Sequence, residues 1–181
     1  QAQNVAQAAF VVSPEKLDSF DLGMKTQWLE NTLRLNADAF YLKYKDLQVF
    51  EFGQSLNFVL ANADATVKGI EIQALVAPSR DFNAGATFSY QDAKFTSNPS
   101  FAGAMLPYEG NELSKAPKVK WSVFSELSHP VAGGTLLGRV NYDFQDDFFY
   151  NPANEAASLQ KSYGVLGGYM SWEASNGLKF S

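Results

Sequence analysis

Apolar and polar side chains alternate along most of this chain, in segments of about ten residues separated by turns. A period of two places alternate residues on opposite faces of a β-strand, so each segment has one apolar and one polar face. The clearest segment covers residues 82–91. The same alternation predicts strands over residues 19–28, 33–41, 69–76, 119–127, 136–144 and 163–172, and the start of an eighth at Leu178.

The connections between these segments alternate between short and long. Short connections are predicted at residues 29–32, 78–81, 129–134 and 175–177, the last containing the Asn-Gly pair typical of hairpins. Long connections, rich in Asn, Pro, Ser and acidic residues, cover residues 46–65, 92–117 and 145–161. Outer-membrane barrels have this rhythm, with tight periplasmic turns and long outer loops. We therefore predict an all-β fold, an antiparallel transmembrane β-barrel whose consecutive strands pair with each other.

The alternation alone leaves a soluble β-sandwich open as well, because its strands also have two faces. A soluble fold turns its apolar faces inward, whereas a membrane barrel turns them toward lipid. In the membrane interpretation, the apolar row Phe82, Ala84, Ala86 and Phe88 faces lipid, and Asn83, Thr87 and Ser89 face the lumen. Tryptophans at the strand ends favour the membrane, because aromatic girdles lie at both interfaces. The predicted girdle residues are Trp28, Trp121 and Trp172.

Composition excludes several classes of function. The formal net charge is −5, and the chain has no run of Lys or Arg that would neutralise a row of phosphates, so nucleic acid is not an expected partner. There are no cysteines and one histidine, His129, so no transition-metal cluster, cofactor or enzyme activity is expected. No stretch approaches the roughly 18 apolar residues of a transmembrane helix. A mean hydropathy of −0.19 is compatible with a barrel, because half of each strand faces a polar lumen.

Several motifs occur in the same order as in a known family. Residues 13–25 read SPEKLDSFDLGMK, and they are followed by RLN at 34–36, AFY at 39–41 and YKDLQ at 44–48. Further along come NADATVKGIE at 62–71, LPYEGN at 106–111 and AP at 116–117. From about Val12 to Trp172, this series resembles the barrel of TonB-dependent outer-membrane receptors.

The resemblance implies a location and a set of partners. It implies an outer-membrane receptor that imports a scarce nutrient, such as a ferric siderophore, energised by TonB acting on a plug domain. Outer-membrane lipid and lipopolysaccharide are the implied surroundings. Such barrels need about 22 strands, so residues 1–181 are interpreted as part of the barrel domain, with the plug and the final strands absent. The region before Ser13 lacks clear alternation, so this chain alone is not expected to close.

The sequence nominates five candidate ligand-binding residues. They lie in the long connections and combine carboxylates with aromatic rings: Asp146, Asp147, Phe148, Tyr150 and Tyr108. Charged residues on the polar rows are expected to line the lumen, where pairing among themselves and contact with a plug are the ordinary roles. These residues are Lys25, Arg34, Asp38, Glu71 and Arg139.

Two alternative functions remain open from the sequence. A passive, porin-like channel would share the girdles and loops but would lack a plug. A soluble β-sandwich binding module would share the alternation but would not require detergent.

Overall fold

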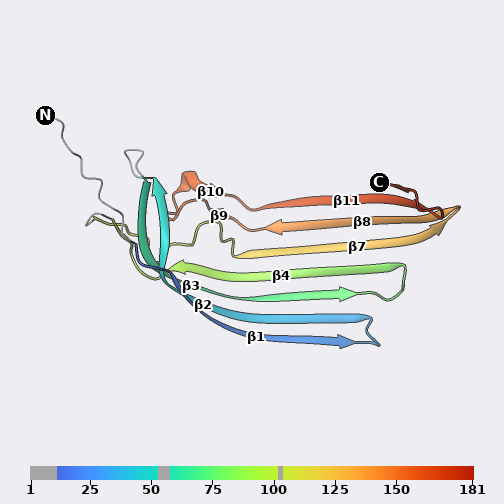
Figure 1. The fold of residues 1–181 in the computed structure, drawn as a ribbon, viewed down its shortest axis with the longest axis horizontal. Coiled ribbons are helices and arrows are strands. Elements are labelled where there is room, and N and C mark those ends of the chain that lie inside the picture. The colour runs from blue at the N-terminus through green and yellow to red at the C-terminus, as the bar shows by residue number, and fades with distance from the viewer. Residues whose placement is uncertain (1–11, 53–57, 102–103) are drawn as a thin grey trace.

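The computed structural model describes residues 12–52, 58–101 and 104–181. Within them, eight strands form one antiparallel sheet in the order β1-β2-β3-β4-β7-β8-β11-β12 (Figure 1). Their bounds are β1 (Lys16–Trp28), β2 (Leu33–Phe52), β3 (Phe58–Val76), β4 (Phe82–Phe95), β7 (Val119–Val131), β8 (Gly134–Gln145), β11 (Tyr163–Ala174) and β12 (Lys179–Phe180). Two small hairpins and one 3-10 turn lie in the connections: β5 (Ser100–Phe101) with β6 (Ala104–Met105), β9 (Phe148–Phe149) with β10 (Leu159–Gln160), and η1 (Ala156–Ser158).

Consecutive long strands pair antiparallel with each other, as the sequence predicts. The predicted short connections are tight turns, and glycine supplies the left-handed backbone at Gly133 (φ 78°) and Gly177 (φ 86°). The turn predicted over 129–134 is narrower than expected, because β7 continues to Val131 and β8 starts at Gly134. No helix in the described ranges is both long and apolar enough to cross a membrane.

The strand register assembles the apolar positions into continuous rows. Directly paired residues share a face of a sheet, and one such row crosses six strands: Met24, Ala37, Ile72, Phe88, Trp121 and Phe144. No second layer of described residues covers this face, so Leu22 is 79% exposed and Leu166 is 72% exposed. A contiguous apolar face of this extent marks a surface that contacts lipid or protein. A soluble sandwich would bury it against a second sheet.

The long connection predicted at 46–65 is wrong for most of its length. β2 continues to Phe52 and β3 begins at Phe58, so these residues form an extended hairpin, of which residues 53–57 lie outside the described residues. The pairing shifts between Tyr44 and Leu47, and Asp46 adopts a positive φ of 58°. Such a β-bulge bends a strand and increases its twist. Figure 1 shows this end of β2 and β3 turning away from the rest of the sheet.

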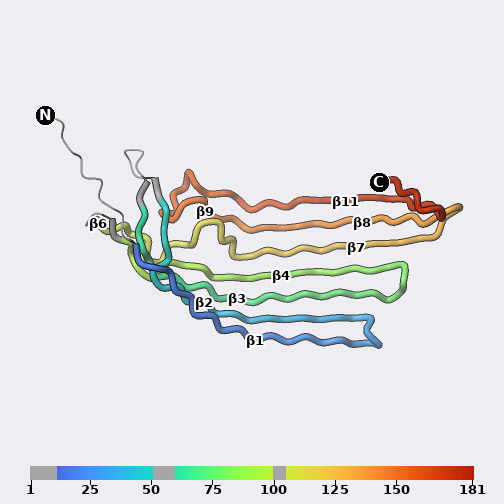
Figure 2. The backbone as a smooth tube through the Cα atoms, in the orientation of Figure 1, coloured from blue at the N-terminus to red at the C-terminus, as the bar shows by residue number. Residues whose placement is uncertain are grey.

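Buried side chains gather at the end of the sheet opposite the tight turns. Figure 2 shows the extended hairpin and the segments around β6 and β9 at that end. Their apolar cluster comprises Val49, Ala63, Ala65, Phe95 and Tyr108. The other two long connections, at 92–117 and 145–161, therefore pack with the extended hairpin into a small core at this end of the sheet. We refer to the three long connections (46–65, 92–117 and 145–161) as the loop cluster.

We expect glycine to be required at position 69 of β3 and not at position 138 of β8. A Cβ added to Gly69 would overlap the carbonyl oxygen of Tyr90 and lie 2.7 Å from Phe40 Cζ, whereas a Cβ at Gly138 meets no atom within 4 Å. Gly69→Ala should therefore destabilise the barrel by about 1–3 kcal/mol through overpacking. Gly138→Ala should be neutral or slightly stabilising, because alanine loses less backbone entropy on folding. Urea unfolding of the complete protein from lipid vesicles measures both, and equal stabilities for the two variants would contradict the close approach at Gly69.

Candidate functional site

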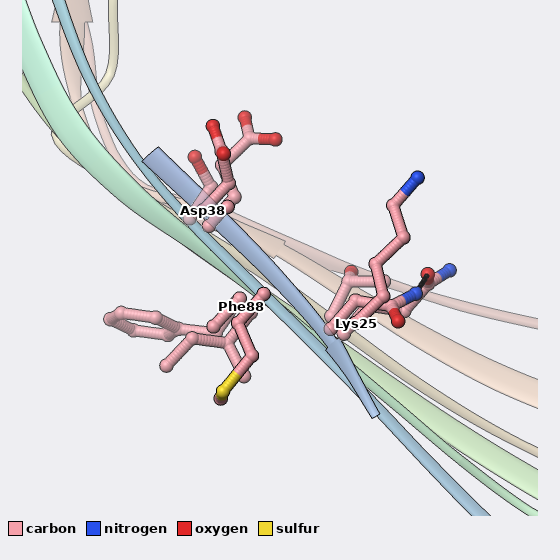
Figure 3. A pocket seen from close by; sticks show the side chains of 12 residues that line it. Lys25, Asp38 and Phe88 are labelled. Carbon is pink, nitrogen blue, oxygen red and sulfur yellow. Dashed lines mark hydrogen bonds between the residues drawn. The ribbon is translucent and has the colours of Figure 1, made fainter. Parts of the chain in front are cut away.

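The polar face of the sheet carries two kinds of charged row. In the first, cross-strand pairing puts Gly23 beside Asp38, Asp38 beside Glu71, and Glu71 beside Ser89. Lys25 lies on the same face, and Figure 3 shows Asp38 and Lys25 on one side of the strands and Phe88 on the other. These side chains, together with Met24, Ile72 and Phe88 of the apolar face, are among the residues that line a hollow at this part of the sheet. A two-sided sheet with this arrangement presents charge to one compartment and apolar surface to the other.

The second polar row is joined by contacts among its own side chains. Arg139 Nη1 lies 3.5 Å from Glu126 Oε2, and Asn83 Nδ2 donates a hydrogen bond of 3.1 Å to Glu126 Oε1. The Arg139 guanidinium also stacks over the Phe124 ring at 4.0 Å. Arg139 therefore pairs with an acidic residue of the same sheet. Such pairing is the role that the sequence predicts for charged residues on the polar rows. Arg34, on the same face, is exposed.

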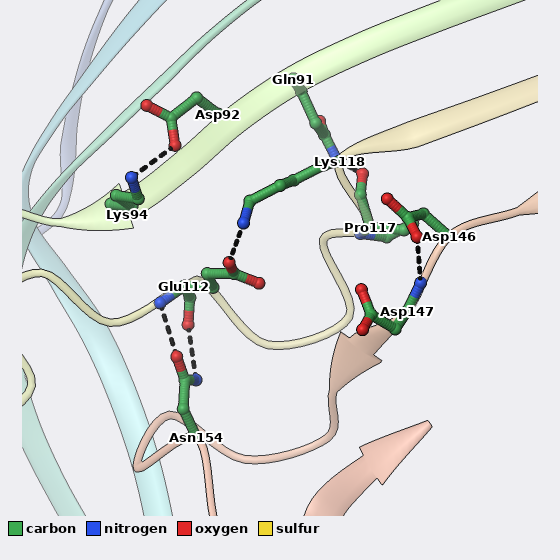
Figure 4. Close-up of polar contacts among 9 residues, drawn as sticks. All are labelled: Gln91, Asp92, Lys94, Glu112, Pro117, Lys118, Asp146, Asp147 and Asn154. Carbon is green, nitrogen blue, oxygen red and sulfur yellow. Dashed lines mark hydrogen bonds and ion pairs between the residues drawn. The ribbon is translucent and has the colours of Figure 1, made fainter. Parts of the chain in front are cut away.

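Side chain to backbone hydrogen bonds tie the loop cluster together. Asn154 Oδ1 accepts from the Glu112 backbone N–H at 2.7 Å, and Asn154 Nδ2 donates to the Glu112 carbonyl at 3.0 Å (Figure 4). Asn111 Nδ2 donates to the Pro152 carbonyl at 3.0 Å. Both bonded pairs join the 92–117 connection to the 145–161 connection. They therefore hold these two loops in one arrangement.

An ion pair adds to this connection. Lys118 Nζ lies 2.5 Å from Glu112 Oε1, and this hydrogen bond to Glu112 raises the pKa of the Lys118 ammonium above its ordinary value (Figure 4). Both side chains remain partly exposed to water. The pair therefore contributes little to global stability, and its main effect is to orient the loop at residue 112.

We expect Asn154→Ala to loosen the contact between the two loops. The change removes both hydrogen bonds to Glu112 and places alanine at a positive φ of 54°, a conformation that asparagine tolerates better. Leaving the Glu112 amide without its partner should cost about 1–3 kcal/mol of local stability. Hydrogen exchange at residues 108–114 should then accelerate.

The matched control is Asn154→Gly, which relieves the backbone strain but restores neither hydrogen bond. It should show most of the same acceleration. Unchanged exchange in both variants would show that the Asn154 contacts do not hold the loops.

The structure separates the sequence-predicted loop candidates. Tyr108 is only 4% exposed and packs against Phe95, with ring centroids 6.0 Å apart; Phe148 is 7% exposed and contacts the Tyr150 ring edge-on at 5.0 Å. Tyr150 is 54% exposed. Two of the aromatic rings thus support the loop cluster, and the third is accessible.

The two carboxylates differ in the same way. Asp146 is half-buried, and its Oδ1 accepts a hydrogen bond of 2.9 Å from the Asp147 backbone N–H. Asp147 is exposed. Asp146 therefore shapes its turn, while Asp147 is free to meet a solute. A ligand-binding role for these residues stays a prediction.

The loop cluster forms a groove that sequence reasoning did not find. Its volume is about 670 Å³, and its lining includes Phe50, Lys115, Tyr150, Asn151 and Glu155. Phe50 is 65% exposed, and Lys115 Nζ lies 5.9 Å from the centroid of the Tyr150 ring. The Lys115 backbone N–H donates to the Phe149 carbonyl at 2.8 Å, which brings the two loops together. The groove therefore combines two aromatic side chains, Phe50 and Tyr150, with Lys115, and these three residues come from separate parts of the chain.

The three tryptophans lie on the apolar face, at the ends where the sequence places them. Trp28 is 57% exposed next to the turn after β1, and Trp172 stacks on Phe180 at 6.0 Å near the last turn. Trp121 stacks on Phe144 at 5.6 Å toward the other end of the sheet. Their positions suit interfacial anchors, and their role as a girdle remains a prediction.

Metal binding has no support in the described residues. No group of three or more His, Cys, Asp or Glu side chains there is arranged to hold a metal ion. His129 is exposed and lies opposite Leu136 in the β7–β8 pair.

Comparison with known proteins agrees with this geometry. The model of the TonB-dependent receptor-like β-barrel family matches residues 2–181. The ferric yersiniabactin uptake receptor FyuA from Yersinia pestis has a similar fold (TM-score 0.72, 20% identity, 90% of this chain and 23% of that one). So does BauA, the ferric preacinetobactin receptor from Acinetobacter baumannii (0.68, 20%, 90% and 23%). A third is the FrpB iron transporter from Neisseria meningitidis (0.63, 13%, 90% and 24%).

These structures share the fold with this chain, which spans about a quarter of their length. The family comprises transport receptors of the outer membrane and not enzymes. Its barrels cross the membrane with strands whose apolar faces meet lipid, and the uncovered apolar face of β1 to β11 has this form. The match over residues 2–181 shows that the chain belongs to the TonB-dependent receptor-like β-barrel family and lies in the bacterial outer membrane.

Proposed function

We propose that this chain forms part of the wall and outer mouth of a receptor that actively imports a ferric siderophore or a similar iron complex, energised by TonB. Family membership supports the transport role, and two proteins of similar structure are a ferric yersiniabactin uptake receptor and a ferric preacinetobactin receptor. In this proposal, a plug domain and the remaining barrel strands come from residues outside this stretch.

The groove in the loop cluster is the observation that carries the proposal at the level of residues. Phe50 and Tyr150 offer exposed rings, and Lys115 offers a cation close to one of them. A chelate with flat rings and negative charge would stack on the rings and be attracted by the ammonium. The hydrogen bonds from Asn154 and Asn111 keep the two loops together, so less entropy is lost when a ligand orders the site.

Uptake of radioactive iron by whole cells tests the proposal. Cells would express the protein from its complete gene, with TonB present or deleted, and receive ferric complexes of hydroxamate, catecholate or citrate type. We expect uptake of at least one complex, and loss of that uptake without TonB. Equal uptake without TonB would indicate the passive, porin-like alternative. No uptake of any complex by cells with surface-exposed receptor would refute iron import.

A pair of variants tests the groove itself. Tyr150→Ala with Lys115→Gln removes a ring and a charge, and losing a partly desolvated cation and its aromatic partner should weaken binding of the transported complex about 5- to 30-fold. Lys161→Gln, an exposed lysine outside the groove lining, is the control and should bind as the wild type does. Wild-type affinity in the double variant would move the ligand site elsewhere.

A further inference from the structure

The lipid-facing side of the sheet changes character abruptly at its loop end. From Trp28 to Phe20 the outward positions of β1 cover roughly 26 Å at about 3.3 Å per residue, which matches an apolar band of about 25 Å. The next outward positions are charged. Five lysines lie at or beyond this end of the apolar band, on the same face as Phe20 and Tyr41 by register: Lys16, Lys43, Lys45, Lys68 and Lys94.

Two of these lysines share one acidic partner within the protein. Lys94 Nζ lies 3.0 Å from Asp92 Oδ1, and Lys68 Nζ lies 3.7 Å from Asp92 Oδ2. Within the part of the chain that the structure describes, no ion pair reaches Lys16, Lys43 or Lys45. All three are exposed. We call Lys16, Lys43 and Lys45 the lysine triad.

The pairing within the triad is unfavourable for the isolated protein. Lys16 and Lys45 are direct cross-strand partners in the β1–β2 pair, and Lys43 lies two residues from Lys45 on the same face. Like charges placed directly opposite each other destabilise a sheet. The acidic residues on this side are Asp18, Asp64 and Asp92. Asp18 is the direct cross-strand partner of Lys43, although no ion pair joins them among the described residues. Asp92 already binds Lys68 and Lys94, and Asp64 accepts the Asp46 backbone N–H at 3.0 Å. An external anion between Lys16 and Lys45 would remove the repulsion.

We propose that the lysine triad binds the phosphate groups of an outer-leaflet glycolipid, with the acyl chains of that lipid lying on the apolar face below. The position decides the class of ligand, because the triad lies directly beyond the last aromatic row, at the level of lipid headgroups. Charge complementarity supports it, since this basic patch belongs to a chain of net charge −5. Phe20 is 66% exposed and Leu22 is 79% exposed, so acyl chains have open apolar surface to cover.

The surface is separate from the groove proposed for the iron complex. The triad lies on the outward face, whereas the groove is lined by residues of the loop cluster. A failure of one proposal therefore leaves the other standing. Lipid binding at the triad would anchor β1 and β2 to the outer leaflet.

The test is native mass spectrometry of the detergent-solubilised full protein with bisphosphorylated lipid A, in EDTA so that no divalent cation bridges phosphate to carboxylate. The variant carries Lys16→Gln, Lys43→Gln and Lys45→Gln. A basic side chain near an anionic lipid surface gains about fivefold in affinity, so the triple variant should bind roughly 100-fold more weakly. Replacing the same three lysines by arginine should retain binding, which shows that the loss is one of charge.

A matched control removes three lysines elsewhere: Lys25→Gln and Lys120→Gln on the polar face, and Lys161→Gln near the start of β11. It has the same net charge as the test variant, and we expect wild-type lipid A binding. Equal loss in both variants would reduce the effect to overall charge and overturn the site. Wild-type binding by the test variant, or displacement of the lipid by millimolar inorganic phosphate, would equally overturn a lipid site. Heat-modifiable gel migration confirms that each variant is folded.

Discussion

Residues 1–181, expressed alone and refolded in detergent, are expected not to form a closed, protease-resistant barrel. In the described residues, β1 and β12 are the two ends of the sheet and do not pair with each other. β12 contains only two residues and pairs with β11 at Trp172 and Glu173. Each unpaired N–H or C=O group facing hydrocarbon costs several kcal/mol, because no water is present to satisfy it.

The cost falls on one whole edge of β1, a strand of 13 residues. We therefore propose that strands from outside this stretch complete the sheet in the native receptor. The measurement is gel migration before and after heating, together with protease digestion, for residues 1–181 and for the complete protein in parallel. A compact, protease-resistant monomer of residues 1–181 would contradict this account and favour a small self-contained barrel.

A second large effect is expected for arginine placed on the apolar face. Ala86 lies between Ala74 and Val123 in the register, and its side chain is exposed on the apolar face. Ala86→Arg should destabilise the complete protein by about 2–4 kcal/mol if the residue lies near the bilayer midplane, because a guanidinium must enter hydrocarbon. Equilibrium unfolding in urea from lipid vesicles measures this difference.

The matched control is Thr87→Arg, one position along the same strand and on the opposite face. Thr87 is also exposed, and its hydroxyl shares a hydrogen bond of 2.7 Å with Ser122. Losing that bond should cost only about 0.5–1.5 kcal/mol. Equal destabilisation at positions 86 and 87 would mean that both faces meet the same environment, which no membrane barrel permits.

The strands and their faces could be predicted from the sequence because one physical constraint acts at every position. Between residues 82 and 91, each side chain meets either lipid or water, and the alternation expresses that directly. The short turns were equally readable, since Gly177 after Asn176 supplies the left-handed backbone that a tight hairpin needs.

The loop end could not be predicted in the same way. Ala61, Ala63 and Ala65 are small residues among Asn and Asp, a composition typical of a loop, yet they are buried in strand β3. These alanines adopt strand conformation because they pair with residues distant in the sequence, such as Phe95 opposite Ala65. The bulge at Asp46, which bends the strands, has no sequence pattern of its own.

The candidate site shows the same limit. Tyr108 and Phe148 were nominated from the sequence as ligand-binding candidates, but both are buried because the loops pack on each other. Lys115 was not predicted, since its place beside Tyr150 depends on the hydrogen bond from its backbone N–H to the Phe149 carbonyl. An alternating polar residue can be assigned to a face from sequence, whereas a loop residue acquires its role from the packing of the loops.

The central claim is that the apolar face of this sheet meets lipid while the polar face lines an aqueous lumen. The chain contains no cysteine, so single cysteines at positions 82–89 of β4 can carry spin labels without background from this stretch. Electron paramagnetic resonance of the complete protein in lipid vesicles then compares relaxation by oxygen, which concentrates in lipid, with relaxation by a water-soluble nickel chelate. We predict a period of two, with oxygen access highest at Phe82, Ala84, Ala86 and Phe88 and chelate access highest at Asn83, Thr87 and Ser89. The opposite phase, or no alternation along β4, would contradict the account.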